Sequence, residues 1–124
     1  MSRRTAQRDA IRATFAANDR PLKPEEVLAL AQDVVPGMGA ATVYRNLRRL
    51  TDDGWLQVVE LPGEPTKLYE RSDLEHHHHF HCSDCDRVYD VHLCPGDLSH
   101  LAPAGFVVRR HELVLYGTCD NCTT

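Results

Sequence analysis

Four of the five cysteines form two Cys-x2-Cys pairs, Cys82 with Cys85 and Cys119 with Cys122. Each pair bends the backbone so that two thiolates face one ion at about 2.3 Å, and two pairs complete a closed tetrahedral zinc site. Such a site is structural, because it leaves no position for water or substrate, and it supplies folding free energy to a small domain. Redox-active Cys-x2-Cys motifs or free thiols are the alternative. The fifth cysteine, Cys94, is expected to be a free thiol rather than a ligand.

Four consecutive histidines, residues 76–79, precede Phe80, His81 and the first cysteine pair. In a strand, alternation places His77, His79 and His81 on one face and His76 and His78 on the other, so one strand could supply two metal sites. The residues that could complete these sites are Glu70, Asp90, Asp97 and His111.

Mixed histidine and carboxylate ligands suit Zn²⁺, Mn²⁺, Fe²⁺ and Co²⁺ alike, so the types of ligand do not identify the metal that binds. The alternative is a set of solvated surface histidines, and this is the interpretation expected for His81, His92 and His100.

The elements expected in the first half form a winged helix. Helical spacing of apolar residues predicts helices over 6–17, from Pro24 to the turn at Pro36-Gly37, and over 39–53 before Gly54. Alternating residues then predict strands over 55–61 and 67–70, joined by a turn at 62–65.

The second half is expected to be a small α/β domain, with strands over 76–82, 87–91 and 106–116 and a short helix over 96–102. The predicted fold class is therefore α+β. An N-terminal winged helix-turn-helix domain covers residues 1–71, the hinge lies at about 70–75, and a C-terminal metal-binding domain covers residues 72–124.

The total charge of −4 conceals an asymmetry along the chain: residues 1–55 carry +2, residues 56–71 carry −1 and residues 72–124 carry −5. The first half thus suits a phosphate-bearing partner and the second suits cations. Neither a membrane-spanning apolar run nor a signal-peptide core is apparent, so a soluble, cytoplasmic protein is expected.

The third predicted helix has an inner apolar face, formed by Val43, Leu47 and Leu50, and an outer face of different character. The outer face carries Ala41, Tyr44, Arg45 and Arg48. Small, aromatic and cationic residues together suit entry into the major groove of DNA. A solvated basic face is the alternative, which the position of this helix directly before a wing disfavours.

Over essentially its whole length the sequence resembles the ferric uptake regulator (Fur) family of metalloregulators. The resemblance rests on residues 41–47 (ATVYRNL), on the His-His-x-His-x-x-Cys-x-x-Cys pattern ending at Cys85, and on residues 115–119 (LYGTC). It implies DNA contacts by Tyr44 and Arg45, with Arg48 as a further candidate.

The resemblance also implies the assignment of ligands to sites. Structural zinc would be held by Cys82, Cys85, Cys119 and Cys122. A regulatory site at the hinge would comprise Glu70, His77, His79 and Asp90, and a second site in the dimerisation domain His76, His78, Asp97 and His111. The sequence departs from the family at Pro21, where many members have a hinge-site histidine, and at Ser72, near which zinc-sensing members often have a cysteine.

The function implied is a homodimeric repressor that binds A/T-rich palindromic operators when loaded with Zn²⁺, Mn²⁺ or Fe²⁺ and controls metal-uptake or homeostasis genes. The alternatives are a peroxide-sensing regulator of the same family and a metal-binding adaptor that does not bind DNA. A zinc hydrolase is disfavoured because no His-Glu-x-x-His or comparable pair is present, so the protein is not expected to be an enzyme.

Overall fold

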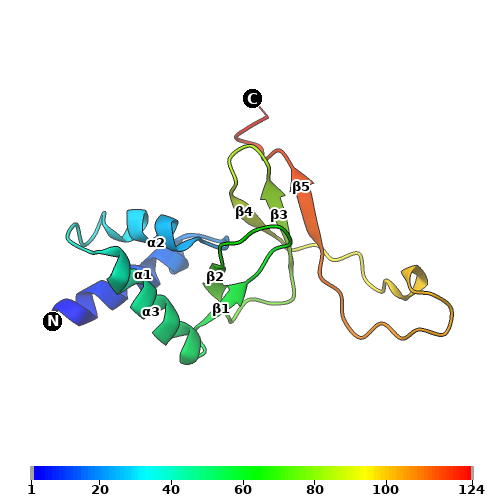
Figure 1. The fold of residues 1–124 in the computed structure, drawn as a ribbon, viewed down its shortest axis with the longest axis horizontal. Coiled ribbons are helices and arrows are strands. Elements are labelled where there is room, and N and C mark those ends of the chain that lie inside the picture. Colours follow the sequence, from blue (N-terminus) through cyan, green and yellow to red (C-terminus); the bar gives the residue numbers. More distant parts are fainter. Residues whose placement is uncertain (1, 124) are drawn as a thin grey trace. The chain divides into compact units, whose positions relative to one another are not determined.

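The computed structural model describes residues 2–123, which divide into two compact units with the boundary between Leu74 and Glu75 (Figure 1). The first unit contains three helices and a two-stranded sheet, and the second contains a three-stranded sheet and a long loop. No helix in the described part of the chain has both the length and the apolar character needed to cross a membrane.

The helices of the first unit are α1 (Arg3–Ala17), α2 (Pro24–Ala31) and α3 (Ala40–Asp52). The Ser2 hydroxyl accepts the Thr5 amide proton at 3.1 Å and caps α1, which begins three residues before the predicted start. The second helix ends at Ala31, earlier than predicted, because the chain continues in tight turns, in which the Asp33 and Val34 amides bond carbonyls three residues back. Most of the buried side chains of this unit form one core: Ala10, Ile11, Phe15, Leu22, Val27, Ala31, Met38, Val43, Leu47, Leu50 and Leu56.

The sheet of the first unit pairs β1 (Leu56–Val59) with β2 (Leu68–Arg71) in antiparallel register. An additional bridge joins the segment before α2 to β2, where Leu22 and Tyr69 exchange two backbone hydrogen bonds, both of 2.9 Å. Three helices followed by this hairpin form the predicted winged helix.

The sheet of the second unit has the order β4-β3-β5, with β3 (His78–Cys82) in the centre, β4 (Val88–Val91) antiparallel to it and β5 (Val114–Gly117) parallel to it. The residues from 92 to 113, yellow to orange in Figure 1, leave the sheet as a long loop. A short 3₁₀ turn, η1 (Ser99–Leu101), is the helical element of that loop.

Two predictions for this loop are wrong. The strand expected over 106–116 begins only at Val114, because residues 106–112 pair with no described strand, and Phe106 and Val107 are 69% and 77% exposed. The helix expected over 96–102 is reduced to the three-residue turn, which buries no side chain that could stabilise a longer helix.

Candidate metal sites and DNA-binding surface

The parallel pairing of β3 with β5 brings the two cysteine pairs together. Cys82 ends β3 opposite Gly117, and Cys119 follows two residues later. Because parallel strands leave a sheet at the same edge, the turns that carry Cys85 and Cys122 both begin there. Gly117 also leaves room for the neighbouring ring, since a Cβ atom at this position would lie 3.1 Å from Cζ of Phe80.

The four sulfur atoms have the spacing of a tetrahedral zinc site. All lie within 4.8 Å of one another, and the Sγ atoms of Cys85 and Cys119 are 3.8 Å apart. Zinc–sulfur bonds of about 2.3 Å at tetrahedral angles give an edge of about 3.8 Å. The Sγ atom of Cys82 also accepts backbone N–H bonds from Cys85 at 3.5 Å and Cys119 at 3.3 Å. The cluster is therefore positioned for a zinc ion.

Hydrogen bonds within the cluster shift the pKa values of its thiols in opposite directions. The backbone amides of Cys85 and Cys119 lower the pKa of Cys82 to about 6. The pKa of Cys122 is raised to about 12, first by its hydrogen bond with Cys119 and second by burial. The shifts thus favour the thiolate form of Cys82, and the pKa of Cys119 is lowered as well, first by a hydrogen bond with Tyr89. The thiolate is the form that binds metal.

A second cluster lies on the face of β3 that carries the odd-numbered histidines. Nε2 of His77 and Nε2 of His79 lie 3.4 and 3.5 Å from the same Oδ1 atom of Asp90, which is the register partner of His79 on β4. The ring of His92 lies 5.9 Å from the ring of His77. These contacts bring together three of the four residues predicted for the regulatory site.

Glu70, the fourth predicted member, belongs to the first unit. It is buried on β2, where its Oε1 atom accepts a hydrogen bond of 2.9 Å from Nε2 of Gln57 on β1. Its participation in the regulatory site remains a prediction.

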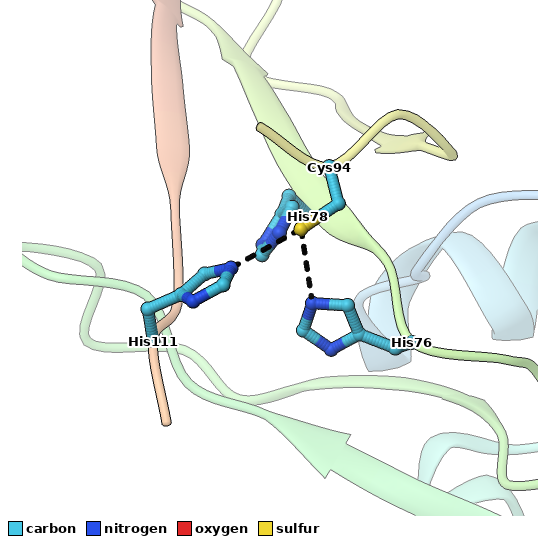
Figure 2. A group of neighbouring side chains, drawn as sticks. All are labelled: His76, His78, Cys94 and His111. Atoms are coloured by element: carbon cyan, nitrogen blue, oxygen red, sulfur yellow. Dashed lines mark hydrogen bonds between the residues drawn. The ribbon is translucent and has the colours of Figure 1, made fainter. Parts of the chain in front are cut away.

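A third cluster lies on the opposite face of β3 (Figure 2). It comprises His76, His78, Cys94 and His111, whose candidate ligand atoms all lie within 4.8 Å of one another. The Cys94 Sγ atom lies 3.6 Å from Nε2 of His76 and 3.2 Å from Nε2 of His111. The three histidines predicted for the second site are thus together.

Asp97 was predicted as the fourth member of this cluster, but the structure places Cys94, which was expected to be a free thiol, beside the three histidines instead. The Asp97 carboxylate lies outside the group and accepts hydrogen bonds from the Ser99 amide (2.9 Å) and hydroxyl (2.6 Å). Those two bonds lower the pKa of Asp97. The sequence signal for Cys94 is weak, because the residue belongs to neither cysteine pair and only the turn at Pro95-Gly96 distinguishes its surroundings.

His81, which alternation also placed on the face of His77, is held by an acidic residue of the β3–β4 turn. Its Nε2 atom lies 2.6 Å from Oδ1 of Asp86. His100 lies on the short 3₁₀ turn and is exposed.

The outer face of α3 is available to a partner. Val43, Leu47 and Leu50 are buried, whereas Tyr44 is 56% exposed and Arg45 and Arg48 are exposed beside it. Nη2 of Arg45 donates to the Thr42 hydroxyl at 3.1 Å. The apolar face fixes the helix on the core, and an aromatic ring and two guanidinium groups remain at its surface.

The family model described as "Ferric uptake regulator family" matches residues 2–116 of this sequence. The chain belongs to the ferric uptake regulator family. Members of the family are metal-binding transcription regulators, not enzymes, and they bind DNA as dimers.

Individual Fur-family relatives differ in what their names say they respond to. The peroxide-responsive repressor PerR of Staphylococcus saprophyticus is 35% identical over 95% of this chain and 80% of its own length. The structure of a ferric uptake regulator from Francisella tularensis with iron is 25% identical, with a TM-score of 0.71 over 100% of this chain and 94% of that one. FurB from Mycobacterium tuberculosis, a zinc uptake regulator, is 28% identical, with a TM-score of 0.54 over 97% and 95%.

Proposed function

We propose that this Fur-family chain is a repressor whose binding to an A/T-rich palindromic operator is strengthened by a divalent metal ion. The observation that carries the proposal is the presence, in one chain, of an exposed Tyr44, Arg45 and Arg48 face on α3 and of a His77, His79 and Asp90 cluster with metal-ligand spacing. Such a repressor acts in the cytoplasm, where its DNA target lies, and controls genes of metal uptake or homeostasis.

In this proposal α3 enters the major groove. Arg45 pairs with guanine edges or phosphates, Tyr44 packs against thymine methyl groups, and Arg48 contacts the backbone. The buried inner face of α3 holds these side chains on a rigid helix, so their spacing is fixed before DNA arrives.

The regulatory ion is proposed to bind His77, His79, Asp90 and Glu70. Because Glu70 belongs to the DNA-binding unit and the other three to the second unit, an ion shared by all four restrains the orientation of one unit against the other. Metal then favours the DNA-competent state by its differential affinity for that state, and DNA tightens metal binding by the same factor.

The four-cysteine cluster is proposed to hold structural Zn²⁺. Its donor set is soft, closed and tetrahedral in spacing, and therefore suits zinc better than Mn²⁺ or Mg²⁺. What the ion supplies there is a crosslink between the end of the chain and β3.

The homodimer is proposed to form through the second unit. Its long loop exposes Leu93, Leu101, Phe106 and Val107 at 82%, 71%, 69% and 77%, which is unusual for apolar side chains in a monomer. On β5, an edge strand, Leu115 and Tyr116 are half exposed. A second copy of the chain would cover these surfaces and give the twofold symmetry that a palindromic operator requires.

The test is a DNA titration in which only the regulatory metal varies. Fluorescence anisotropy with an A/T-rich palindromic duplex should give tighter binding after addition of Zn²⁺, Mn²⁺ or anaerobic Fe²⁺ to protein that retains its structural zinc. A scrambled duplex of equal length controls for non-specific binding, and Asp90→Asn should lose the response while retaining basal binding. Equal affinity with and without every ion would refute the metal-linked proposal, and absence of specific binding would favour an adaptor.

A peroxide-sensing regulator is the second candidate, favoured by the 35% identity to a peroxide-responsive repressor. In that case Fe²⁺-loaded protein exposed to hydrogen peroxide should gain oxygen on a histidine of the His77 and His79 cluster and lose DNA affinity. Peptide mass mapping detects the added oxygen, and Zn²⁺-loaded protein is the control because Zn²⁺ is redox-inert.

A further inference from the structure

We infer that Cys94 is a metal ligand and that it completes, with His76, His78 and His111, a three-nitrogen, one-sulfur site for a thiophilic divalent ion of the Zn²⁺ class. The site differs from the one expected from the sequence because a thiolate takes the position of a carboxylate. It goes beyond the proposed DNA-binding function, since it stands whether or not the cluster at His77 regulates DNA affinity.

The distances at Cys94 match a tetrahedral ion. Zinc–nitrogen bonds of about 2.05 Å and a zinc–sulfur bond of about 2.3 Å at tetrahedral angles give a nitrogen–sulfur edge of about 3.5 Å. The observed separations from Cys94 Sγ are 3.6 Å to His76 Nε2 and 3.2 Å to His111 Nε2. The three imidazoles surround one point, with ring centroids of His76, His78 and His111 4.6, 5.1 and 5.4 Å apart in pairs.

His78 supplies an independent reason for a ligand at this point. Its side chain is only 3% exposed, its Nδ1 atom accepts the Leu113 amide proton at 3.2 Å, and its Nε2 atom is buried without a hydrogen-bond partner among the described residues. A buried polar atom without a hydrogen-bond partner is costly, and a bound ion is one of the groups that can satisfy it. An ion at Nε2 would satisfy it.

The backbone around Cys94 resembles that of the cysteine pairs. The Gly96 amide donates to Cys94 Sγ at 3.4 Å, as the Cys85 amide does to Cys82, and Gly96 turns the chain with a φ of +86°. An N–H donor pointing at sulfur stabilises a thiolate, the form that binds metal. Asp97 is not among the residues whose ligand atoms converge here, and its Oδ1 atom accepts two hydrogen bonds from Ser99 within its own turn.

The donor set decides the class of ion. Thiolate and imidazole together suit Zn²⁺ and Co²⁺, whereas Mn²⁺ prefers carboxylate, carbonyl and water oxygens. Three neutral imidazoles and one thiolate leave a net charge of +1 with a divalent ion. The site is therefore expected to bind Zn²⁺ and Co²⁺ and to discriminate against Mn²⁺.

The first test needs no variant. Protein carrying one Zn²⁺ per chain in the four-cysteine site is treated with N-ethylmaleimide alone, with further Zn²⁺, or with Mn²⁺. Mass spectrometry then gives the alkylated fraction of the peptide that contains Cys94. Zn²⁺ should protect Cys94 from alkylation and Mn²⁺ should not. Cys94 alkylated equally fast under all three conditions would overturn the inference.

The second test reads the sulfur ligand directly. Co²⁺ added to the same zinc-loaded protein should give a thiolate-to-cobalt charge-transfer band. Cys94→Ser should remove this band, and Cys94→Asp should bind Co²⁺ through a carboxylate oxygen without it. Zn²⁺ affinity at this site should fall more than about 100-fold in Cys94→Ser, since loss of even an outer-shell partner typically costs about 10–100-fold. Asp97→Asn is the matched control and should leave both the band and the affinity unchanged.

Two results would contradict the assignment: a charge-transfer band that persists in Cys94→Ser, or a band lost in Asp97→Asn. The Leu113 amide gives a local check by NMR. An ion at His78 Nε2 places the ring proton on Nδ1, so the Leu113 amide must turn away and its resonance should shift on loading. None of these measurements involves DNA, so their failure is distinguishable from failure of the proposed repressor function.

Discussion

Removing one thiolate from the four-cysteine cluster by Cys82→Ser should unfold the second unit under conditions in which the first unit stays folded. Cys82 is fully buried, and its sulfur accepts two backbone N–H bonds, so the substitution removes both a ligand and the acceptor of those bonds. In the described part of the second unit, the buried apolar side chains are Cys82, Val88 and Cys119, whereas the first unit has a core of eleven residues.

The expected size of the effect follows from the zinc. Structural Zn²⁺ contributes about 10–16 kcal/mol in comparable small sites, or about 3 kcal/mol per thiolate if shared equally. Since a loss of about 1.4 kcal/mol in binding free energy lowers affinity tenfold, zinc affinity should fall about 100-fold or more. Burial of Val88 contributes only about 2 kcal/mol, so the apolar side chains of this unit cannot replace the ion.

Two measurements check this prediction on the full chain. Competition with a chromophoric chelator gives the zinc affinity, and ¹H–¹⁵N NMR spectra report each unit separately through its own amides. Cys94→Ser is the matched control, because it makes the same chemical change outside the four-cysteine cluster and should keep the tightest zinc in place. A Cys82→Ser protein that holds zinc as tightly as the wild type, or a metal-free protein whose second-unit amides stay dispersed, would refute the reasoning.

Arg45→Ala should weaken specific operator binding by about 5–150-fold per protomer, the value of about 1–3 kcal/mol for a bidentate base contact, without changing zinc content. Anisotropy titrations with Arg109→Ala, an exposed arginine of the second unit, test whether this is merely lost charge; equal losses would contradict a specific contact. Leu47→Ala, at a fully buried position of α3, should cost about 2–5 kcal/mol and lower the midpoint of the first unit's thermal unfolding by at least about 8 °C. Circular dichroism measures this, and a shift below about 2 °C would mean that α3 is not held by that side chain. Burial, followed by the neighbouring His76 and His111, lowers the pKa of His78, so the unfolded chain takes up its proton first as pH falls through about 6.5. The free energy of unfolding of the second unit should therefore decrease from pH 7 to pH 5. Urea unfolding at several pH values should show a smaller decrease for His78→Gln, and an unchanged decrease would assign the effect to other groups.

Local patterns predicted the order and type of the elements in the first unit, but not the start of α1 or the end of α2. The spacing of Val43, Leu47 and Leu50 predicted both the extent of α3 and its exposed face, and Gly54 marked its end with a φ of +82°. Periodicity identifies such elements because the core lies on one side of each. The same argument separated the histidines of β3 into two faces before their partners were known.

Features that depend on distant contacts could not be predicted. Residues 106–112 have the composition of a strand, but a strand needs a neighbour and no described strand pairs with them. Cys94 joins His76 and His111 only because β4 ends and the chain turns at Gly96, which brings together residues up to 18 positions apart. Asp97 was the more conventional ligand by type, but hydrogen bonds to Ser99, two residues away, direct it elsewhere.

The paired backbone hydrogen bonds between Leu22 and Tyr69 bear on how a pull at one point would spread through the winged helix. Glu70 is the next residue after Tyr69, and Leu22 lies two residues before α2 begins. A displacement of Glu70 is therefore transmitted to α2 through the hydrogen bonds between Tyr69 and Leu22, and is not confined to the hairpin of β1 and β2. The winged helix should therefore move as one rigid unit, so that a displacement of Glu70 also displaces α3.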